Sequence, residues 1–234
     1  MDPLYRIKNA RLNGHLPDDV SAKILERFSI AVDGIDRIER ASGLYFPTAY
    51  VEPSAVISPA SQFGYGVLFA RTIPLFDGGR FGVLVQISAP LLVYGLKGTI
   101  HAILAHEFLH YLELMRRIHR GEVLSDEITG NLFEGAYLDQ TRILEPAAVF
   151  KDRTLINHIK KRFASSFQEP RLERKVVEKW INAGLPKTVI PLDNNRVNIS
   201  ADLLTKMRLP SDMVTALDIM YEKSKKIRTR YKLY

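Results

Sequence analysis

The chain has 234 residues, with 33 lysines and arginines against 26 acidic residues, which gives a formal net charge of +7 at pH 7. It contains no cysteine, so disulfide bonds, thiol catalysis and cysteine-ligated structural zinc are excluded. Hydrophobic residues make up 46% and charged residues 25% of the sequence, the profile of an ordinary soluble globular protein. A chain of this length forms one large domain or two small lobes around a cleft.

No targeting or membrane segment is expected. The first six residues lack a basic stretch followed by an apolar one, so we expect no signal peptide. The longest apolar stretch, residues 81–96, is interrupted by Gln86, Ser88 and Pro90 and is too short to span a bilayer. The default expectation is therefore a cytoplasmic protein without a membrane span.

The first elements combine a helix with a strand pair. Apolar residues recur at helical spacing over residues 18–41, and Gly43 is placed to end that helix. Residues 44–60 are rich in proline and serine and indicate a loop or short extended pieces. Residues 65–70 and 81–87 have strand composition, and the turn signal at 77–80 between them favours a hairpin.

The next element carries the most informative motif of the chain, His106-Glu107-Phe108-Leu109-His110. On a helix, with Thr99 as N-cap and Gly121 as its end, His106 and His110 lie one turn apart on the same face. Two neutral imidazoles in this position can hold one metal ion, with Glu107 placed to act as general base on its water. Apolar residues flank the motif on both sides, so a lone buried Glu107 needs a partner or a metal.

This stretch resembles the zincin metallopeptidases, most closely over residues 100–112. The resemblance implies an α+β, zincin-like, two-lobed metallopeptidase with one zinc ion and a peptide or protein substrate. Residues 1–121 would form an N-terminal lobe with a small mixed sheet and the active-site helix. Residues 122–234 would form a mainly helical lobe that supplies the third ligand to a single catalytic unit. In such enzymes the strand before the active-site helix, here 81–89, commonly rims the cleft and pairs with extended substrate.

The third ligand is not expected on the motif helix, where Glu113 is the least favoured alternative. The metzincin pattern is excluded because Glu113 and Arg116 stand where it needs glycine and histidine. His101 and His119 lie on other faces of the helix, and Glu113 would put three ligands in a line.

A glutamate from a second helix, over residues 125–144, is the remaining arrangement and resembles the gluzincins. We expect Glu134, which lies at a spacing from His110 similar to that in the angiotensin-converting-enzyme family, with Glu127 as the alternative. Leu138 stands where gluzincins often carry the aspartate that orients the first histidine, so Asp139 or Asn131 is the candidate for that role. The candidate oxyanion stabilisers are Tyr137 and His158.

The second half of the chain is expected to be mostly helical. One helix begins at Pro146 and runs into residues 160–162, and another covers 171–183 and ends before Pro186. Residues 188–192 and 196–199 favour a small hairpin, followed by two helices with Ser200 and Ser211 as N-caps.

The preferred hypothesis is a zinc-dependent peptidase, and two alternatives remain open. Residues 151–179 and 222–232 are rich in lysine and arginine, which allows a nucleic-acid-associated metalloprotease that docks through its basic half. The missing aspartate at position 138 allows a non-catalytic zincin-like scaffold, in which the metal is structural or absent. The basic tail, residues 223–234, is a candidate segment to fold over the cleft and keep an enzyme latent.

Overall fold

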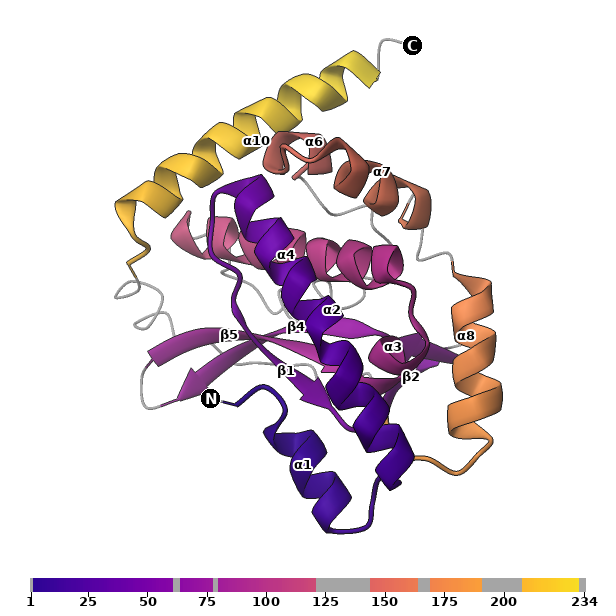
Figure 1. Cartoon of the computed structure of the whole chain (residues 1–234). Helices are drawn as coiled ribbons and strands as arrows, with labels where there is room; N and C mark the ends of the chain where they lie inside the picture. Colours follow the sequence, from indigo (N-terminus) through magenta and orange to yellow (C-terminus); the bar gives the residue numbers. More distant parts are fainter. Residues whose placement is uncertain are drawn as a thin grey trace.

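The computed structural model describes residues 2–60, 64–77, 80–120, 144–163, 169–190 and 208–231. They form a mixed α+β structure (Figure 1). The helices are α1 (Tyr5–Leu12), α2 (Asp18–Ser42), α3 (Ala89–Tyr94), α4 (Lys97–His119), α6 (Pro146–Val149), α7 (Arg153–Arg162), α8 (Pro170–Val176), the π-helical η2 (Val177–Ile181) and α10 (Ser211–Tyr231). The strands are β1 (Thr48–Glu52), β2 (Ala55–Ala60), β3 (Gly64–Leu68), β4 (Ala70–Asp77), β5 (Arg80–Ser88) and β6 (Lys187–Val189).

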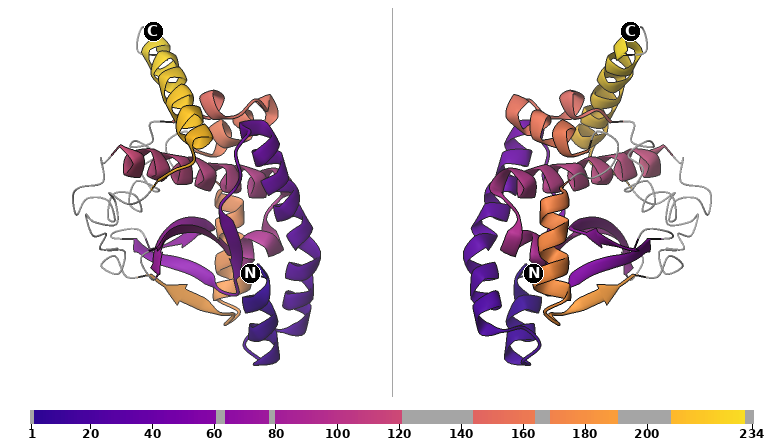
Figure 2. Two further views of the ribbon diagram at one scale, coloured as in Figure 1. Left: turned by 90° about the vertical axis from the view of Figure 1, so that its left-hand side faces the viewer. Right: turned by 90° about the vertical axis from the view of Figure 1, so that its right-hand side faces the viewer.

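The strands form two three-stranded sheets. In the first, of order β1-β5-β4, β1 runs parallel to β5 and β4 runs antiparallel to it. In the second, of order β3-β2-β6, β2 is antiparallel to β3 and parallel to β6. Figures 1 and 2 show α4 lying between the first sheet and a layer made by α6, α7 and α10.

Helix α4 is the centre of the core. Eighteen of its 23 residues are buried, because the sheet, α2, α7 and α10 all pack on it. Its long runs of apolar residues are stable in such an enclosed position. The pentad therefore lies in the middle of the molecule, not on a surface helix.

Helix α2 packs closely on α4 where a glycine meets a histidine. A methyl group at Gly34 would come within 2.9 Å of the His101 ring, so this crossing requires glycine. The His101 ring in turn lies 3.2 Å from the carbonyl oxygen of Ile30. Gly43, with φ of 76°, ends α2 in the left-handed conformation that glycine adopts without strain.

An ion pair ties the far end of α2 to the start of α7. Arg37 donates to both carboxylate oxygens of Asp152, at 2.6 and 3.0 Å. Asp152 also caps α7 by accepting from the backbone N–H of Leu155. The Arg37 guanidinium and these caps lower the pKa of Asp152 to about 2.

Several sequence expectations are confirmed in the described residues. Helix 18–41 is α2, helix 171–183 corresponds to α8 and η2, and a helix begins at Ser211. The α+β class is also confirmed. Among the described helices, none is long and apolar enough to cross a membrane.

The hairpin expectation is wrong in its first strand. Its turn signal is correctly placed, but β5 pairs with β4 over residues 70–77, whereas residues 65–68 belong to β3 and pair with β2. Residues 44–60 contain two strands, so the loop alternative is wrong there. The idea of 81–89 as an exposed rim is also wrong, because β5 is the central strand of its sheet.

Local signals misplaced several boundaries. Helix α4 begins at Lys97 with no side-chain cap, and Thr99 instead accepts a hydrogen bond from Arg162. The single helix expected from Pro146 is divided into α6 and α7, because Asp152 starts a new helix. Residues 187–189 form β6, paired with β2. Helix α1 carries no strong apolar periodicity and was not expected. The other hairpin arm, Gly121, Ser200 and the helix expected over 125–144 lie outside the described residues.

We expect Asp152→Asn to lower the free energy of unfolding at pH 7 by about 1 kcal/mol. Asparagine keeps the helix cap, so the loss reports the charge pairing with Arg37. Because the folded pKa of Asp152 is depressed, its stabilisation is present above the unfolded value of 3.8 and is lost as pH falls through about 2. Urea unfolding at pH 7, 5, 3 and 2 measures this difference.

The matched control is Asp33→Asn, which removes an exposed partner of Lys97. Its effect should be small at every pH. A wild-type advantage over Asp152→Asn that stays constant down to pH 2 would contradict the expected linkage.

Candidate metal centre

The two histidines of the pentad converge. His106 and His110 are 2% and 9% exposed, and their Nε2 atoms lie 2.9 Å apart with the rings nearly perpendicular. Two Nε2 atoms on one tetrahedral zinc, each at 2.0–2.1 Å, would be about 3.3 Å apart. The observed separation differs by a few tenths of an ångström, so the pair fits a shared metal ion with a small rotation of either ring. The same separation also suits one hydrogen bond between the two nitrogens.

The ring of His106 is fixed by an aromatic neighbour. Phe163, at the C-terminal end of α7, stacks on it with ring centroids 3.8 Å apart and planes 7° apart. This contact covers one face of the imidazole and limits its rotation about the Cβ–Cγ bond. The position of α7 therefore determines the orientation of a candidate metal ligand.

Glu107 is held by strand β4. The hydroxyl of Thr72 lies 2.9 Å from Oε2 of Glu107 and 3.0 Å from the backbone carbonyl oxygen of the same residue. Thr72 is 9% and Glu107 6% exposed, so both groups are removed from bulk water. A carboxylate buried in this way needs such a donor.

Other polar residues of α4 make contacts away from the histidine pair or are exposed. Glu113, 2% exposed, accepts at Oε1 from Arg116 and Arg117, both at 3.2 Å. Those contacts assign it to a buried ion-pair cluster. His119 is exposed near the helix end and His101 faces α2, as their helical positions predicted.

His158 is not brought to the histidine pair. Its ring lies against Gly98, where a methyl group would come within 3.0 Å, at the N-terminal end of α4. With a rise of 1.5 Å per residue, this is about 12 Å along the helix from His106. Burial, together with the nearby charge of Arg162, lowers the pKa of His158.

The remaining expected site residues lie in the segment 121–143, outside the described residues. The described residues contain no group of three or more His, Cys, Asp or Glu side chains arranged to hold a metal. They therefore supply two candidate ligands, and the third is sought in that segment. The residues concerned are Glu134, Glu127, Asp139, Asn131 and Tyr137.

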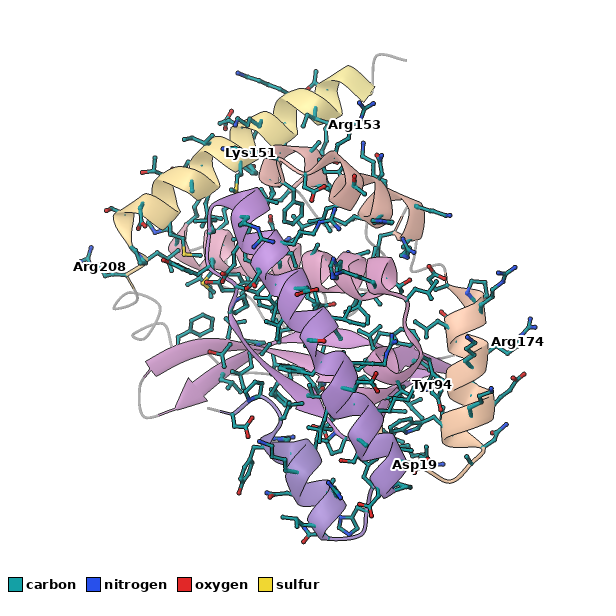
Figure 3. The ribbon with its side chains drawn as sticks, in the orientation of Figure 1. Asp19, Tyr94, Lys151, Arg153, Arg174 and Arg208 are labelled. Atoms are coloured by element: carbon teal, nitrogen blue, oxygen red, sulfur yellow. The ribbon has the colours of Figure 1, made fainter. Side chains whose placement is uncertain are left out.

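Several arginines form ion pairs with acidic residues in the second half of the chain. Arg162 pairs with Glu169, Arg228 with Glu145, and Arg120 with Asp218. Figure 3 labels Arg153 of α7, Arg174 of α8 and Arg208, which precedes α10, and the three are well separated in that view. This arrangement is typical of solvated helix faces.

Sequence reasoning missed Thr72 and Phe163. Nothing in their local sequence marks them, because both contacts join segments far apart in the chain. The only available signal was indirect, since a glutamate within an apolar helix must find a donor.

Comparison with family models, with curated proteins and with solved structures finds no match for this chain.

We expect Thr72→Val to lower the free energy of unfolding by about 1–3 kcal/mol, because it removes the hydrogen bond that the Thr72 hydroxyl donates to the buried Glu107 carboxylate. Thr72→Ser keeps the hydroxyl and should lose less. Urea unfolding in the presence of a chelator measures both. In a double-mutant cycle with Glu107→Ala, the two losses should not add. Additive losses would contradict the contact between these side chains.

Proposed function

We propose that this chain is a zinc-dependent peptidase. The observation that carries the proposal is the convergence of His106 and His110 at 2.9 Å beside a Glu107 that a strand holds in place. Histidines four residues apart on a helix are common in proteins, but this pair is buried, faces one point and has a buried carboxylate next to it. The resemblance to zincins gives all three residues a role at once.

The proposed ligands are His106 and His110 through Nε2, with Glu134, or alternatively Glu127, as the third. When bound, zinc would act as a Lewis acid, which lowers the pKa of a bound water and polarises a peptide carbonyl. Neutral histidines suit this site, since their Nε2 lone pairs are needed for coordination. Phe163 stacks on the His106 ring and limits how far it rotates, so the small adjustment for a metal would fall mainly on His110.

Glu107 is the proposed general base. It accepts a proton from the attacking water and passes it to the leaving amine. The hydrogen bond from Thr72 fixes Oε2 of the carboxylate, so proton transfer occurs from one defined position. Thr72 is accordingly a positioning residue that acts through Glu107.

The proposed substrate-binding strand is β4. It takes the role that the resemblance to zincins implied for residues 81–89, because β4 is an outer strand of its sheet in the described part of the chain and packs against α4. An extended peptide would add to the edge of β4 through backbone hydrogen bonds, with its scissile bond near Glu107. Pro74 lacks a backbone N–H, so pairing along this edge is limited to the residues around it.

We expect the purified protein to contain about one zinc per chain, measured by elemental analysis. His106→Ala, His110→Ala and Glu134→Ala should lose the metal, because each removes a ligand, whereas Glu127→Ala should retain it. If Glu134→Ala retained zinc and Glu127→Ala lost it, Glu127 would be the third ligand instead of Glu134. Absence of zinc from wild type, even after zinc is added back, would refute the metal site.

We expect Glu107→Gln to keep its zinc and to lose hydrolysis of a mixed peptide pool by at least about 100-fold, since general-base catalysis supplies that factor. Product formation is followed by mass spectrometry. The matched control is Glu113→Gln, which alters a neighbouring buried carboxylate bound to arginines. Full activity in zinc-loaded Glu107→Gln would show that this residue is not the base.

A further inference from the structure

A polar row crosses the first sheet on the face opposite to Thr72. The register places Tyr50 beside Gln86 and Gln86 beside Arg71, one residue from each of the three strands. Side chains of neighbouring residues in a strand point to opposite faces. Arg71 and Thr72 therefore present their side chains on the two faces of β4.

The row is held by Gln86, which is 4% exposed. Its amide nitrogen donates to the Tyr50 hydroxyl at 2.8 Å and to Oε2 of Glu52 at 3.0 Å, which uses both of its hydrogens. Its carbonyl oxygen accepts from Nε of Arg71 at 2.5 Å. The guanidinium of Arg71 is thus oriented through its Nε edge, and its two terminal nitrogens form no hydrogen bond with any residue that the structure describes.

This row and its neighbour Arg6 carry more positive than negative charge. Glu52 is already bound by Arg6 at 2.6 Å, and the Arg6 guanidinium also lies over the Tyr50 ring. Within the described residues, no carboxylate forms an ion pair with Arg71. Burial lowers the pKa of Arg71, and the charges of Tyr50, Glu52 and Glu107 oppose that fall only in part. A half-buried guanidinium with a net desolvation cost favours the binding of an anion.

We propose that Arg71 binds a substrate carboxylate, so that the site selects peptides with an acidic group next to the scissile bond. This inference rests on the proposed function and names its substrate class. A peptide added to the edge of β4 would place the side chain opposite Arg71 on the same face, within reach of the guanidinium. The neighbouring substrate residue would lie on the face of Thr72 and Glu107, where the bond is cut. The planar guanidinium suits two parallel hydrogen bonds to a carboxylate.

The substrate carboxylate is either an Asp or Glu side chain or the C-terminus of a short peptide. Matched peptides separate them, with Glu exchanged for Gln at one position at a time, or with the free C-terminus exchanged for an amide. Zinc-loaded wild type should prefer the acidic member of one such pair by about 10- to 100-fold in kcat/KM, mainly through KM. A preference lost on Glu-to-Gln exchange assigns the side chain, and one lost on amidation assigns the C-terminus.

Variants of Arg71 link the preference to this residue. Arg71→Gln should abolish it with little change in kcat for the neutral peptides, and Arg71→Glu should favour lysine at the same position. Arg71→Lys keeps the charge without the planar fork and should retain a smaller preference. The control is Arg174→Gln, which removes the same charge from an exposed position on α8 and should keep the full preference.

Two results would overturn the proposal. One is a wild type that cleaves acidic and neutral members equally. The other is an Arg71→Gln variant that slows all peptides alike while the preference persists, which would assign Arg71 to the chemical step.

A binding assay separates failure of this inference from failure of the proposed function. Glutarate is titrated into the protein, and the side-chain amide signal of Gln86 is followed by NMR, since Gln86 contacts Arg71. We expect a saturable shift in wild type and none in Arg71→Gln. Glutarate binding without any peptide cleavage would support the carboxylate site at Arg71 and contradict the proposed peptidase activity. Cleavage without an acidic preference and without a glutarate shift would support the peptidase activity and contradict the carboxylate site.

Discussion

The burial of α4 on nearly every side is the constraint on which the rest of the structure depends. The polar groups of a helix enclosed in this way favour partners close by, because an unpaired polar group in the core costs up to several kcal/mol. Its sequence places His101, the pentad and Glu113 along successive turns. His101 contacts α2, and the pentad contacts β4 and Phe163 at the end of α7, whereas Glu113 pairs with Arg116 and Arg117 of α4 itself.

These contacts connect the ends of the molecule to the candidate metal centre. Asp152 pairs with Arg37 of α2 and caps α7, and α7 ends at Phe163, whose ring stacks on His106. At the other end of α4, the Arg116 guanidinium lies 4.5 Å from the ring centroid of Tyr221 in α10. The basic C-terminal helix therefore packs on the core beyond Glu113, at the end of α4 that follows the pentad. The packing of α7 therefore influences the orientation of the His106 ring.

The sequence predicted what local chemistry determines. Helical periodicity with a terminal glycine identified α2, and residue types at fixed spacing identified the pentad. Its errors arose where distant segments pair. Strand β5 is central because β1, more than 30 residues earlier, lies parallel to it, and no local signal encodes that pairing. Thr72 could not be found for the same reason, since it meets Glu107 only after β4 has docked on α4.

Strand β4 shows how two polar contacts on opposite faces reinforce one register. A slip of one residue would turn Arg71 towards α4 and Thr72 away from Glu107. That slip is opposed on one face by the hydrogen bond from Arg71 to Gln86, and on the other by the hydrogen bonds from Thr72 to Glu107. Because Thr72 also contacts the backbone carbonyl oxygen of Glu107, it fixes the strand against the helix as well as the carboxylate. The polar row and the candidate site are therefore two sides of the same strand placement, and neither can shift without the other.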